Sequence, residues 1–397
     1  MTLTKQTQHK FFGALLASVL VLSSPAHADD YRDARAESPG AIFNLAMTQA
    51  VNADPQASLL TLESLLKMGV DFGAVELDQF AAVRELDGWK AYEERVHALH
   101  VPFGTADVVT TYDDASFVPE GIAFDNEGQL YLGSIFRGQI VRLGETAEVL
   151  SDRDTHWSVF GVRFHPDGSL WFASAAVPQM AGVGEDEGKT GLFRLDVTSG
   201  TITKAAILPQ YEKSQVLGDL IIADDNTIYA TDSLTGAIYR YYIDSNEFEI
   251  LVQRGKLGSP QGLVLDASGN YLYVADYIGG LYRVWLKDGS LLRLNVADDT
   301  TAYGIDGLYR YGDELIVIQN GIRPNRVAAL QLSDNGLAIT GSRLLASNLE
   351  QFDEPTLGVI RGDDFYFVAN SHWNRFNREN KLPDNLSGPV ILRLSLD

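Results

Sequence analysis

The feature of this sequence that most constrains its fold is a motif that occurs six times after residue 119. Each copy has a short run of strand-forming residues, a polar turn, and a second run that ends in a small or polar residue, as in Glu120–Ser134. The copies begin at Glu120, Phe160, Gly218, Gln261, Asp306 and Pro355, on average about 47 residues apart. A period of about 40 to 50 residues with three or four strands per copy is typical of a β-propeller. We therefore predict an all-β fold, a six-bladed β-propeller, over residues 103–397.

The two ends of this region predict how the ring closes. The last copy finishes with a third strand near 388–394, and too few residues follow it for a fourth. Residues 106–112 form a predicted strand that precedes the first copy and belongs to none of the six. Because an open sheet edge invites aggregation, we expect this strand to complete the last blade.

Residues 29–102 have a helical pattern instead. Apolar residues recur three or four positions apart, for example at Leu59, Leu62 and Leu66. Two helices joined by a turn at 52–55 resemble a single tetratricopeptide-type unit. One such unit cannot bury its own apolar face, so we expect it to pack against the propeller. A structural cap is the preferred interpretation, and a docking surface for a protein partner is the alternative.

Residues 1–28 have the pattern of a secretory signal peptide. Lys5 and Lys10 precede an apolar run at 11–22, and Ala26 and Ala28 frame a cleavage site. We expect cleavage after Ala28 and a mature protein in the periplasm or outside the cell. No other apolar run reaches the roughly 18 residues needed to cross a bilayer, so no membrane association is expected.

Composition narrows the partners and the chemistry. The chain has 53 acidic and 31 basic residues, a formal net charge of −22. A field this negative repels polyanions, which excludes nucleic acid and anionic membranes as partners but favours cations and neutral small molecules. Because cysteine is absent, disulfides, thiolate metal sites and a cysteine nucleophile are excluded. Any chemistry therefore depends on oxygen and imidazole groups.

In a propeller, the starts of the first strands and the ends of the second strands meet at one mouth of the ring. Three of the six first strands begin with an oxygen-bearing side chain, at Glu120, Gln261 and Asp306. Carboxylate and amide oxygens around an axis, with water completing the shell, suit a hard cation such as Ca²⁺. The second strands end in Ser134, Ser174, Asp232, Asp276, Asn320 and Asn370. For Asp232 and Asp276 we expect a structural role in capping the following turn.

These residues carry a resemblance to a known family. Residues 103–397 resemble the senescence marker protein, gluconolactonase and luciferin-regenerating enzyme family of six-bladed propellers. That family holds one divalent cation with a Glu from the first blade, an Asn from the fourth and an Asp from the fifth. Glu120 and Asp306, the latter followed by Gly307, match the first and third positions, and Gln261 stands where Asn is usual. The resemblance implies a divalent-metal-dependent hydrolase of lactones or related cyclic esters, with Ca²⁺ as the expected ion.

Several residues are candidates for the acid–base step of such a reaction. The resemblance implies Asp306, and His156 and His372 are further candidates because both are placed on loops at the predicted mouth. Surface histidines without a catalytic role are the commoner outcome, so this assignment stays open. Arg137, Arg323 and Trp373 are expected at the rim.

Two other classes of function stay open. One is a non-catalytic binding scaffold, in which the metal stabilises the ring and the helices dock a partner. The other is a strictosidine synthase-like condensing activity, ranked lowest because no acid at the mouth is identified for it.

Overall fold

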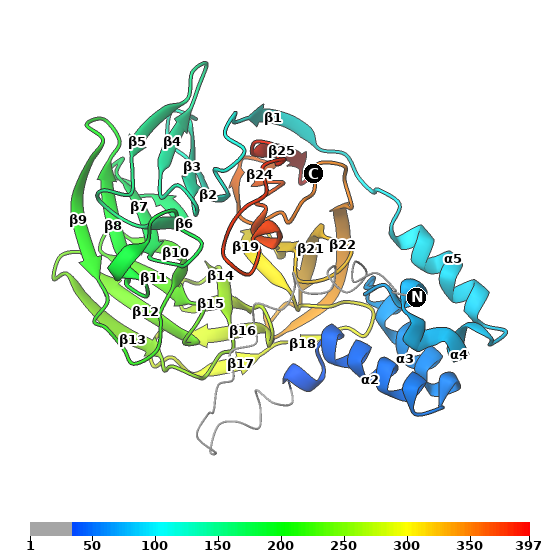
Figure 1. Ribbon diagram of the computed structural model, residues 1–397. Coiled ribbons are helices and arrows are strands. Elements are labelled where there is room, and N and C mark those ends of the chain that lie inside the picture. Colours follow the sequence, from blue (N-terminus) through cyan, green and yellow to red (C-terminus); the bar gives the residue numbers. More distant parts are fainter. Residues whose placement is uncertain (1–33) are drawn as a thin grey trace.

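The computed structural model describes residues 34–397, and the predicted signal peptide lies outside them. No helix within the described residues is long and apolar enough to cross a membrane. The described chain forms a helical segment followed by six β-sheets arranged in a ring (Figure 1). The all-β, six-bladed propeller predicted from the repeat is confirmed.

The helical segment has its own hydrophobic core. Its elements are α2 (Pro39–Val51), α3 (Pro55–Lys67), η2 (Ala74–Glu76), η3 (Asp78–Phe80), α4 (Ala81–Arg84) and α5 (Trp89–Leu99). Helices α2 and α3 begin alike, because Ser38 and Asp54 each accept a hydrogen bond from a backbone N–H of the first turn, and a proline follows each cap. The apolar faces meet in a cluster that includes Phe43, Leu62, Phe80, Trp89 and Tyr92.

Blades 1 to 3 are four-stranded antiparallel sheets whose strands follow one another in chain order. Blade 1 consists of β2 (Pro119–Phe124), β3 (Leu130–Ser134), β4 (Ile140–Leu143) and β5 (Glu148–Ser151). Blade 2 consists of β6 (Ser158–Phe164), β7 (Leu170–Ala175), β8 (Thr190–Asp196) and β9 (Thr201–Ile207). Blade 3 consists of β10 (Leu217–Asp224), β11 (Thr227–Asp232), β12 (Ala237–Tyr242) and β13 (Glu247–Val252).

Blade 4 follows the same plan, and blades 5 and 6 depart from it at their outer edges. Blade 4 consists of β14 (Pro260–Leu265), β15 (Tyr271–Asp276), β16 (Gly280–Trp285) and β17 (Leu291–Arg293). Blade 5 consists of β19 (Ile305–Tyr311), β20 (Glu314–Gln319), β21 (Arg326–Leu332), β22 (Ala338–Ser347) and the short parallel outer strand β18 (Asn295–Val296). Blade 6 consists of β23 (Gly358–Arg361), β24 (Asp364–Val368), β25 (Val390–Ser395) and β1 (Asp107–Thr111).

The ring closes as the sequence predicted. Strand β1, from the start of the propeller, pairs antiparallel with β25 at the end of the chain, with Asp107 opposite Arg393 and Thr111 opposite Val390. The register shifts between Val108 and Thr110, so a bulge twists this outer strand. The sixth blade is thus completed by the residues that precede the first.

The turn of blade 1 shows why the repeated motif folds into hairpins. Asp125 accepts hydrogen bonds from the backbone N–H groups of Glu127 and Gln129 on one carboxylate oxygen. Gly128 in the same turn has a φ of 84°, a conformation that costs a glycine little. The polar residues between the two apolar runs therefore set the register of the strands.

The helical segment packs beside blade 5, near β21 and β22 (Figure 1). Arg326 of β21 donates hydrogen bonds from Nη1 to the carbonyls of Met68 and Gly69, which follow the last turn of α3. The backbone N–H of Asp71 donates to the carbonyl of Arg323 at 2.8 Å. The predicted packing of the helices against the propeller is confirmed, and docking of a protein partner stays a prediction.

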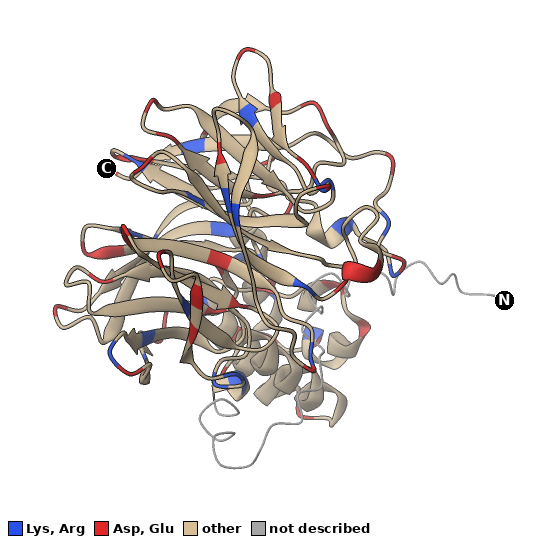
Figure 2. Cartoon of the chain, turned by 90° about the vertical axis from the view of Figure 1, so that its left-hand side faces the viewer, with Lys and Arg blue, Asp and Glu red and all other residues tan. Residues whose placement is uncertain are grey.

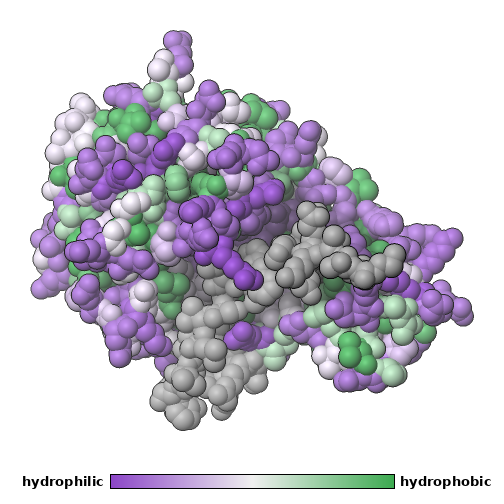
Figure 3. Space-filling model, viewed as in Figure 1, coloured by the Kyte–Doolittle hydropathy of each residue, from purple (hydrophilic) through white to green (hydrophobic). Residues whose placement is uncertain are grey.

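Charged residues are spread over the surface. Figure 2 shows many of the Asp and Glu residues in the connections between strands. Hydrophilic residues dominate the face drawn in Figure 3, where hydrophobic residues form separate small groups. Acidic turns of this kind account for much of the net negative charge.

Candidate functional site

Two carboxylates lie buried where the first strands of blades 1 and 5 begin. Glu120 of β2 is 8% exposed and Asp306 of β19 is 9% exposed. Burial, and next the negative charge of Asp306, raise the pKa of Glu120 well above its usual value. Burial also raises the pKa of Asp306 to about 7, against the hydrogen bond from Asn320 that lowers it. Each carboxylate is therefore desolvated, and the two are close enough to repel each other.

A neighbouring side chain orients each of the three predicted metal ligands. Trp373 Nε1 donates to Glu120 Oε2 at 2.8 Å, and Asn320 Nδ2 donates to Asp306 Oδ2 at 2.7 Å. Gln261, partly exposed at the start of β14, donates from Nε2 to Ser259 Oγ at 3.1 Å. Within residues 34–397 no hydrogen bond involves the other oxygens, Glu120 Oε1, Asp306 Oδ1 and Gln261 Oε1. Each of these three side chains therefore has one atom fixed by a hydrogen bond and one oxygen without a partner among the described residues.

The donor set at the mouth fits a hard cation. In the described part of the chain, no three side chains among His, Cys, Asp and Glu gather in a way that could hold a metal. A cation here would therefore need the amide of Gln261 and water beside Glu120 and Asp306, a mixed oxygen set of the kind that Ca²⁺ accepts. Neither carboxylate has an Arg or Lys ion-pair partner among the described residues. A divalent cation would offset the cost of burying both charges.

Asn320, which follows β20, connects three blades at this point. Its Nδ2 donates both to Asp306 Oδ2 and to the carbonyl of Pro355 at 2.9 Å. Its Oδ1 accepts from the hydroxyl of Tyr277, which follows β15, at 3.0 Å. One amide therefore fixes Asp306 relative to blades 4 and 6.

Two further acids near the axis were missed in the sequence, in each case by one position. The motif aligns Pro355 with the inner ring of side chains, but the acid near Asp306 is Glu354, which has a positive φ of 63°. In blade 3 the motif aligns Gly218, and the acid is Asp219, which is 2% exposed and pairs with Arg163 at 3.1 Å. The sequence could have indicated both, because an acidic residue stands directly next to each of the two aligned positions, Pro355 and Gly218.

His156 is enclosed in blade 2. Its ring packs edge-on against Phe172 at 5.0 Å between centroids, and its Nδ1 lies 2.9 Å from Thr155 Oγ1. Burial lowers the pKa of His156 to about 4, so the imidazole is neutral at neutral pH. Its surroundings are aromatic rings, and none of its described contacts reaches Glu120 or Asp306.

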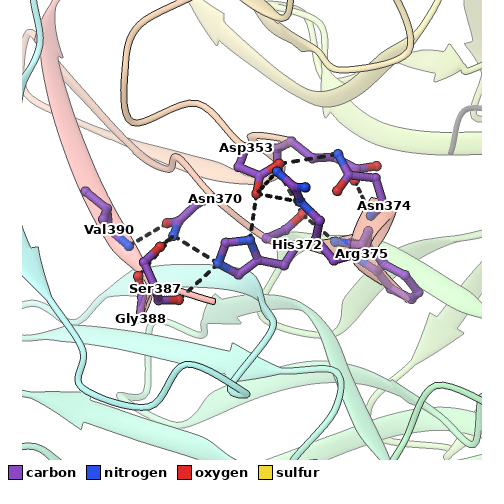
Figure 4. A network of polar contacts seen from close by, with 11 residues as sticks. Asp353, Asn370, His372, Asn374, Arg375, Ser387, Gly388 and Val390 are labelled. Atoms are coloured by element: carbon purple, nitrogen blue, oxygen red, sulfur yellow. Dashed lines mark hydrogen bonds and ion pairs between the residues drawn. The ribbon is translucent and has the colours of Figure 1, made fainter. Parts of the chain in front are cut away.

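His372 lies in a polar network of blade 6 (Figure 4). Its Nδ1 is 2.9 Å from Asp353 Oδ2, and its Nε2 is 3.0 Å from the carbonyl of Ser387. Burial alone would raise the pKa of Asp353, but hydrogen bonds from His372 and Arg375 lower it to about 2. Both ring nitrogens of His372 are thus engaged with fixed acceptors, which suits a structural clasp better than a group that must meet a substrate.

The buried acids at the ends of β11 and β15 have the turn-capping role expected for them. Asp232 Oδ1 accepts from the backbone N–H groups of Val216, Leu234 and Thr235. Asp276 accepts from those of Gly258, Ser259 and Ile278.

A long connection between β24 and β25, residues 369–389, covers part of the mouth, and we call it the strap. Its Trp373 packs on Phe160 of blade 2 with ring centroids 6.4 Å apart, and its Asn380 accepts a hydrogen bond from Gln179. Beside it lies a cavity of about 500 Å³, lined by Asp114, Ala115, Ser116, Phe136, Asn380, Lys381, Leu382, Pro383 and Asp384. Of the predicted rim residues, Arg137 binds Asp114 next to this cavity, at 2.9 Å.

The comparisons with known proteins agree with this architecture. Residues 146–302 match the family model described as "SMP-30/Gluconolactonase/LRE-like region", a stretch that contains blades 2 to 4. The family likeness inferred from the sequence is confirmed over these residues. No curated protein matches the sequence.

Solved structures with the same fold cover about three quarters of this chain. The PQQ-bound aldose sugar dehydrogenase from Streptomyces coelicolor aligns with a TM-score of 0.53 and 13% identity, over 74% of this chain and 100% of that one. A luciferin-regenerating enzyme gives 0.52 and 12% identity, over 74% and 95%. A gluconolactonase from Xanthomonas campestris gives 0.50 and 18% identity, over 75% and 92%. At these identities the likeness shows the fold alone.

Proposed function

We propose that this propeller, which matches the SMP-30/gluconolactonase/LRE family over residues 146–302, is a divalent-metal-dependent hydrolase of lactones or related cyclic esters. The observation that carries the proposal is the pair Glu120 and Asp306, two buried carboxylates with the amide of Gln261 at the same mouth and without a basic partner among the described residues. The expected ion is Ca²⁺, and the expected substrate is a small, uncharged molecule.

The reaction adds water to the carbonyl carbon of the ring. The bond from that carbon to the ring oxygen breaks, and the proton released by water ends on the freed oxygen, giving a hydroxy acid. A cation held by Glu120, Gln261 and Asp306 would supply a Lewis acid for the carbonyl oxygen. Asn320 and Tyr277 keep Asp306 in place, and Trp373 orients Glu120 and limits the access of water at the mouth.

A non-catalytic binding scaffold is the second candidate. Two observations favour it: both histidine candidates have buried structural contacts, and Trp373 of the strap already occupies one oxygen of Glu120. Under this alternative a cation stabilises the ring, and ligands bind without turnover.

A lactone hydrolysis assay separates the two candidates. Purified protein is tested against a panel of sugar, aliphatic and aromatic lactones, with Ca²⁺ and with a chelator. We expect turnover that is lost with chelator and falls at least about a hundredfold in Glu120→Gln and Asp306→Asn. Asp225→Asn, in the exposed hairpin of blade 3, is the matched control and keeps the activity. Tight Ca²⁺ binding without hydrolysis of any lactone would favour the scaffold.

We further propose export of the protein to the periplasm or the medium after cleavage behind Ala28. Sequencing the N-terminus of the protein from its native cells tests this, with Asp29 expected as the first residue.

A further inference from the structure

Glu354 is a carboxylate near the axis that neither the expected cation site nor the reaction described above uses. It lies in the connection that leads into the sixth blade, four residues before β23 begins at Gly358, and has a φ of 63°, a strained value for a residue with a side chain. Its carbonyl accepts hydrogen bonds from the N–H of Ser371 at 3.2 Å and from Ser371 Oγ at 2.8 Å. The strap therefore holds this backbone in a conformation that glutamate rarely adopts.

The carboxylate of Glu354 is fixed on one side and available on the other. Its Oε2 accepts a hydrogen bond from the backbone N–H of Asn374 at 2.6 Å. Its Oε1 has no hydrogen-bond donor among residues 34–397, and the side chain is partly exposed. The carbonyl of the next residue, Pro355, accepts from Asn320, the same amide that holds Asp306. The backbone next to Glu354 and the carboxylate of Asp306 are thus held by the same side chain.

Charged groups on several elements face Glu354. Burial is the main cause that raises its pKa to about 8, the Asn374 N–H opposes the rise, and Asp306 of β19 and the adjacent Asp353 add to it. The positive charge of Arg375 in the strap lowers the pKa of Glu354. Glu354 in turn raises the pKa values of Glu120 of β2 and of Tyr277. A carboxylate with one oxygen fixed by a backbone N–H and the other without a donor is placed to exchange a proton with a bound water.

We propose that Glu354 is the acid–base residue of this mouth, the group that takes a proton from the attacking water and returns it to the ring oxygen. This inference rests on the proposed function. Water oxygen bonds to the carbonyl carbon while its proton passes to Glu354. The carbon–oxygen bond of the ring then breaks, and Glu354 gives the proton to the oxygen that leaves, which regenerates the carboxylate and completes the hydroxy acid.

The assignment divides the acids at the mouth by role. Glu120 and Asp306 each have a free oxygen beside the amide of Gln261 and suit a cation. Glu354 comes from a different blade and is held by the strap, so it can stay uncoordinated and exchange protons. It also takes the role for which His156 and His372 were candidates, since His156 is enclosed by aromatic rings and both ring nitrogens of His372 have other partners.

The test compares Glu354→Gln and Glu354→Asp with the full chain in Ca²⁺. Glu379→Gln is the control, because Glu379 is an exposed strap residue whose carboxylate pairs with Lys381. We measure kcat against pH on the best lactone, Ca²⁺ affinity by calorimetry, and folding by circular dichroism. We expect Glu354→Gln to lower kcat by about 10²- to 10⁴-fold and to abolish the acidic limb of the pH profile. Glu354→Asp keeps that limb at a reduced rate, and Ca²⁺ affinity stays within roughly threefold in all variants.

The outcomes separate this inference from the proposed function. If the wild type hydrolyses lactones and Glu354→Gln keeps kcat within roughly threefold, the inference is wrong and the function stands. A loss of kcat accompanied by an equal loss of Ca²⁺ affinity also overturns it, because Glu354 then serves the cation. If the wild type hydrolyses no lactone, both the proposed function and this inference are wrong. Should Glu354→Gln fail to fold, the pH limb of Glu354→Asp decides the question.

Discussion

The indole N–H of Trp373 donates to Glu120 Oε2 at 2.8 Å, a contact that joins the strap of the last blade to the first strand of the first. Together with the Asn374 N–H on Glu354, it means that two consecutive strap residues bind two of the acids at the mouth. The strap therefore contributes to the site as well as covering it.

Replacing Trp373 by Phe keeps an aromatic ring on Phe160 and removes the donor to Glu120. We expect Ca²⁺ affinity to fall about tenfold, because groups that orient a metal ligand contribute on that scale. Calorimetry with Ca²⁺ measures the change. Trp285→Phe, at a 39% exposed position of β16, is the control and should bind as the wild type does. Equal affinities of both variants would show that the contact does not orient a ligand.

Asn320→Ala removes the amide that joins Asp306, Tyr277 and the carbonyl of Pro355. Because three partners lose a hydrogen bond at a largely buried point, we expect a loss of about 1–3 kcal/mol in the free energy of unfolding. Urea unfolding in the presence of chelator measures it without a contribution from bound metal. Asn385→Ala, at an exposed strap position, should change stability by less than about 0.5 kcal/mol. A loss no larger than that of the control would show that the Asn320 side chain does not stabilise the junction of blades 4, 5 and 6.

Because His156 is buried and neutral, we expect the free energy of unfolding to fall in mild acid. Its folded pKa of about 4 lies below the usual histidine value of 6.5, so the unfolded chain binds a proton between these values when the folded chain does not. The stabilisation is therefore complete above about pH 6.5 and is lost as the pH falls towards 4, by at most roughly 3 kcal/mol. His156→Phe should flatten the dependence between pH 7 and 4.5, measured by urea unfolding, without affecting turnover. His97→Gln, on the exposed face of α5, should leave it as in the wild type.

Arg326→Gln should loosen the helical segment. The guanidinium donates to the carbonyls of Met68 and Gly69 and to Gln319 Oε1 at 2.7 Å, so its loss leaves the end of α3 without its partner on the propeller. We expect a cost of about 1–3 kcal/mol, and faster amide hydrogen exchange in α3 and α5 than in the blades. Arg378→Gln, an exposed charge on the strap, is the control. Unchanged exchange in the helices would mean that the apolar contacts alone hold them.

The sequence predicted the number of blades, the closing strand and the starting positions of Glu120, Gln261 and Asp306, because these follow from regular spacing and alternation. The two acids that it missed lie one position from the residue that the motif aligns. Glu354 lies before β23 and has a positive φ, which nothing in the spacing signals. The surroundings of His156 and His372 were equally hidden, since both depend on side chains brought together from several loops.

The pairing of β1 with β25 has a consequence for the order in which the molecule forms. Asp107 and Arg393 pair with each other although they lie at opposite ends of the propeller sequence. Blade 6 therefore cannot be completed until the ribosome has added the last few residues. Contacts this distant in the chain also close slowly. A nascent chain is therefore an open arc with two unpaired edges for nearly its whole synthesis. A chain truncated before the final strand would keep these two unpaired edges permanently.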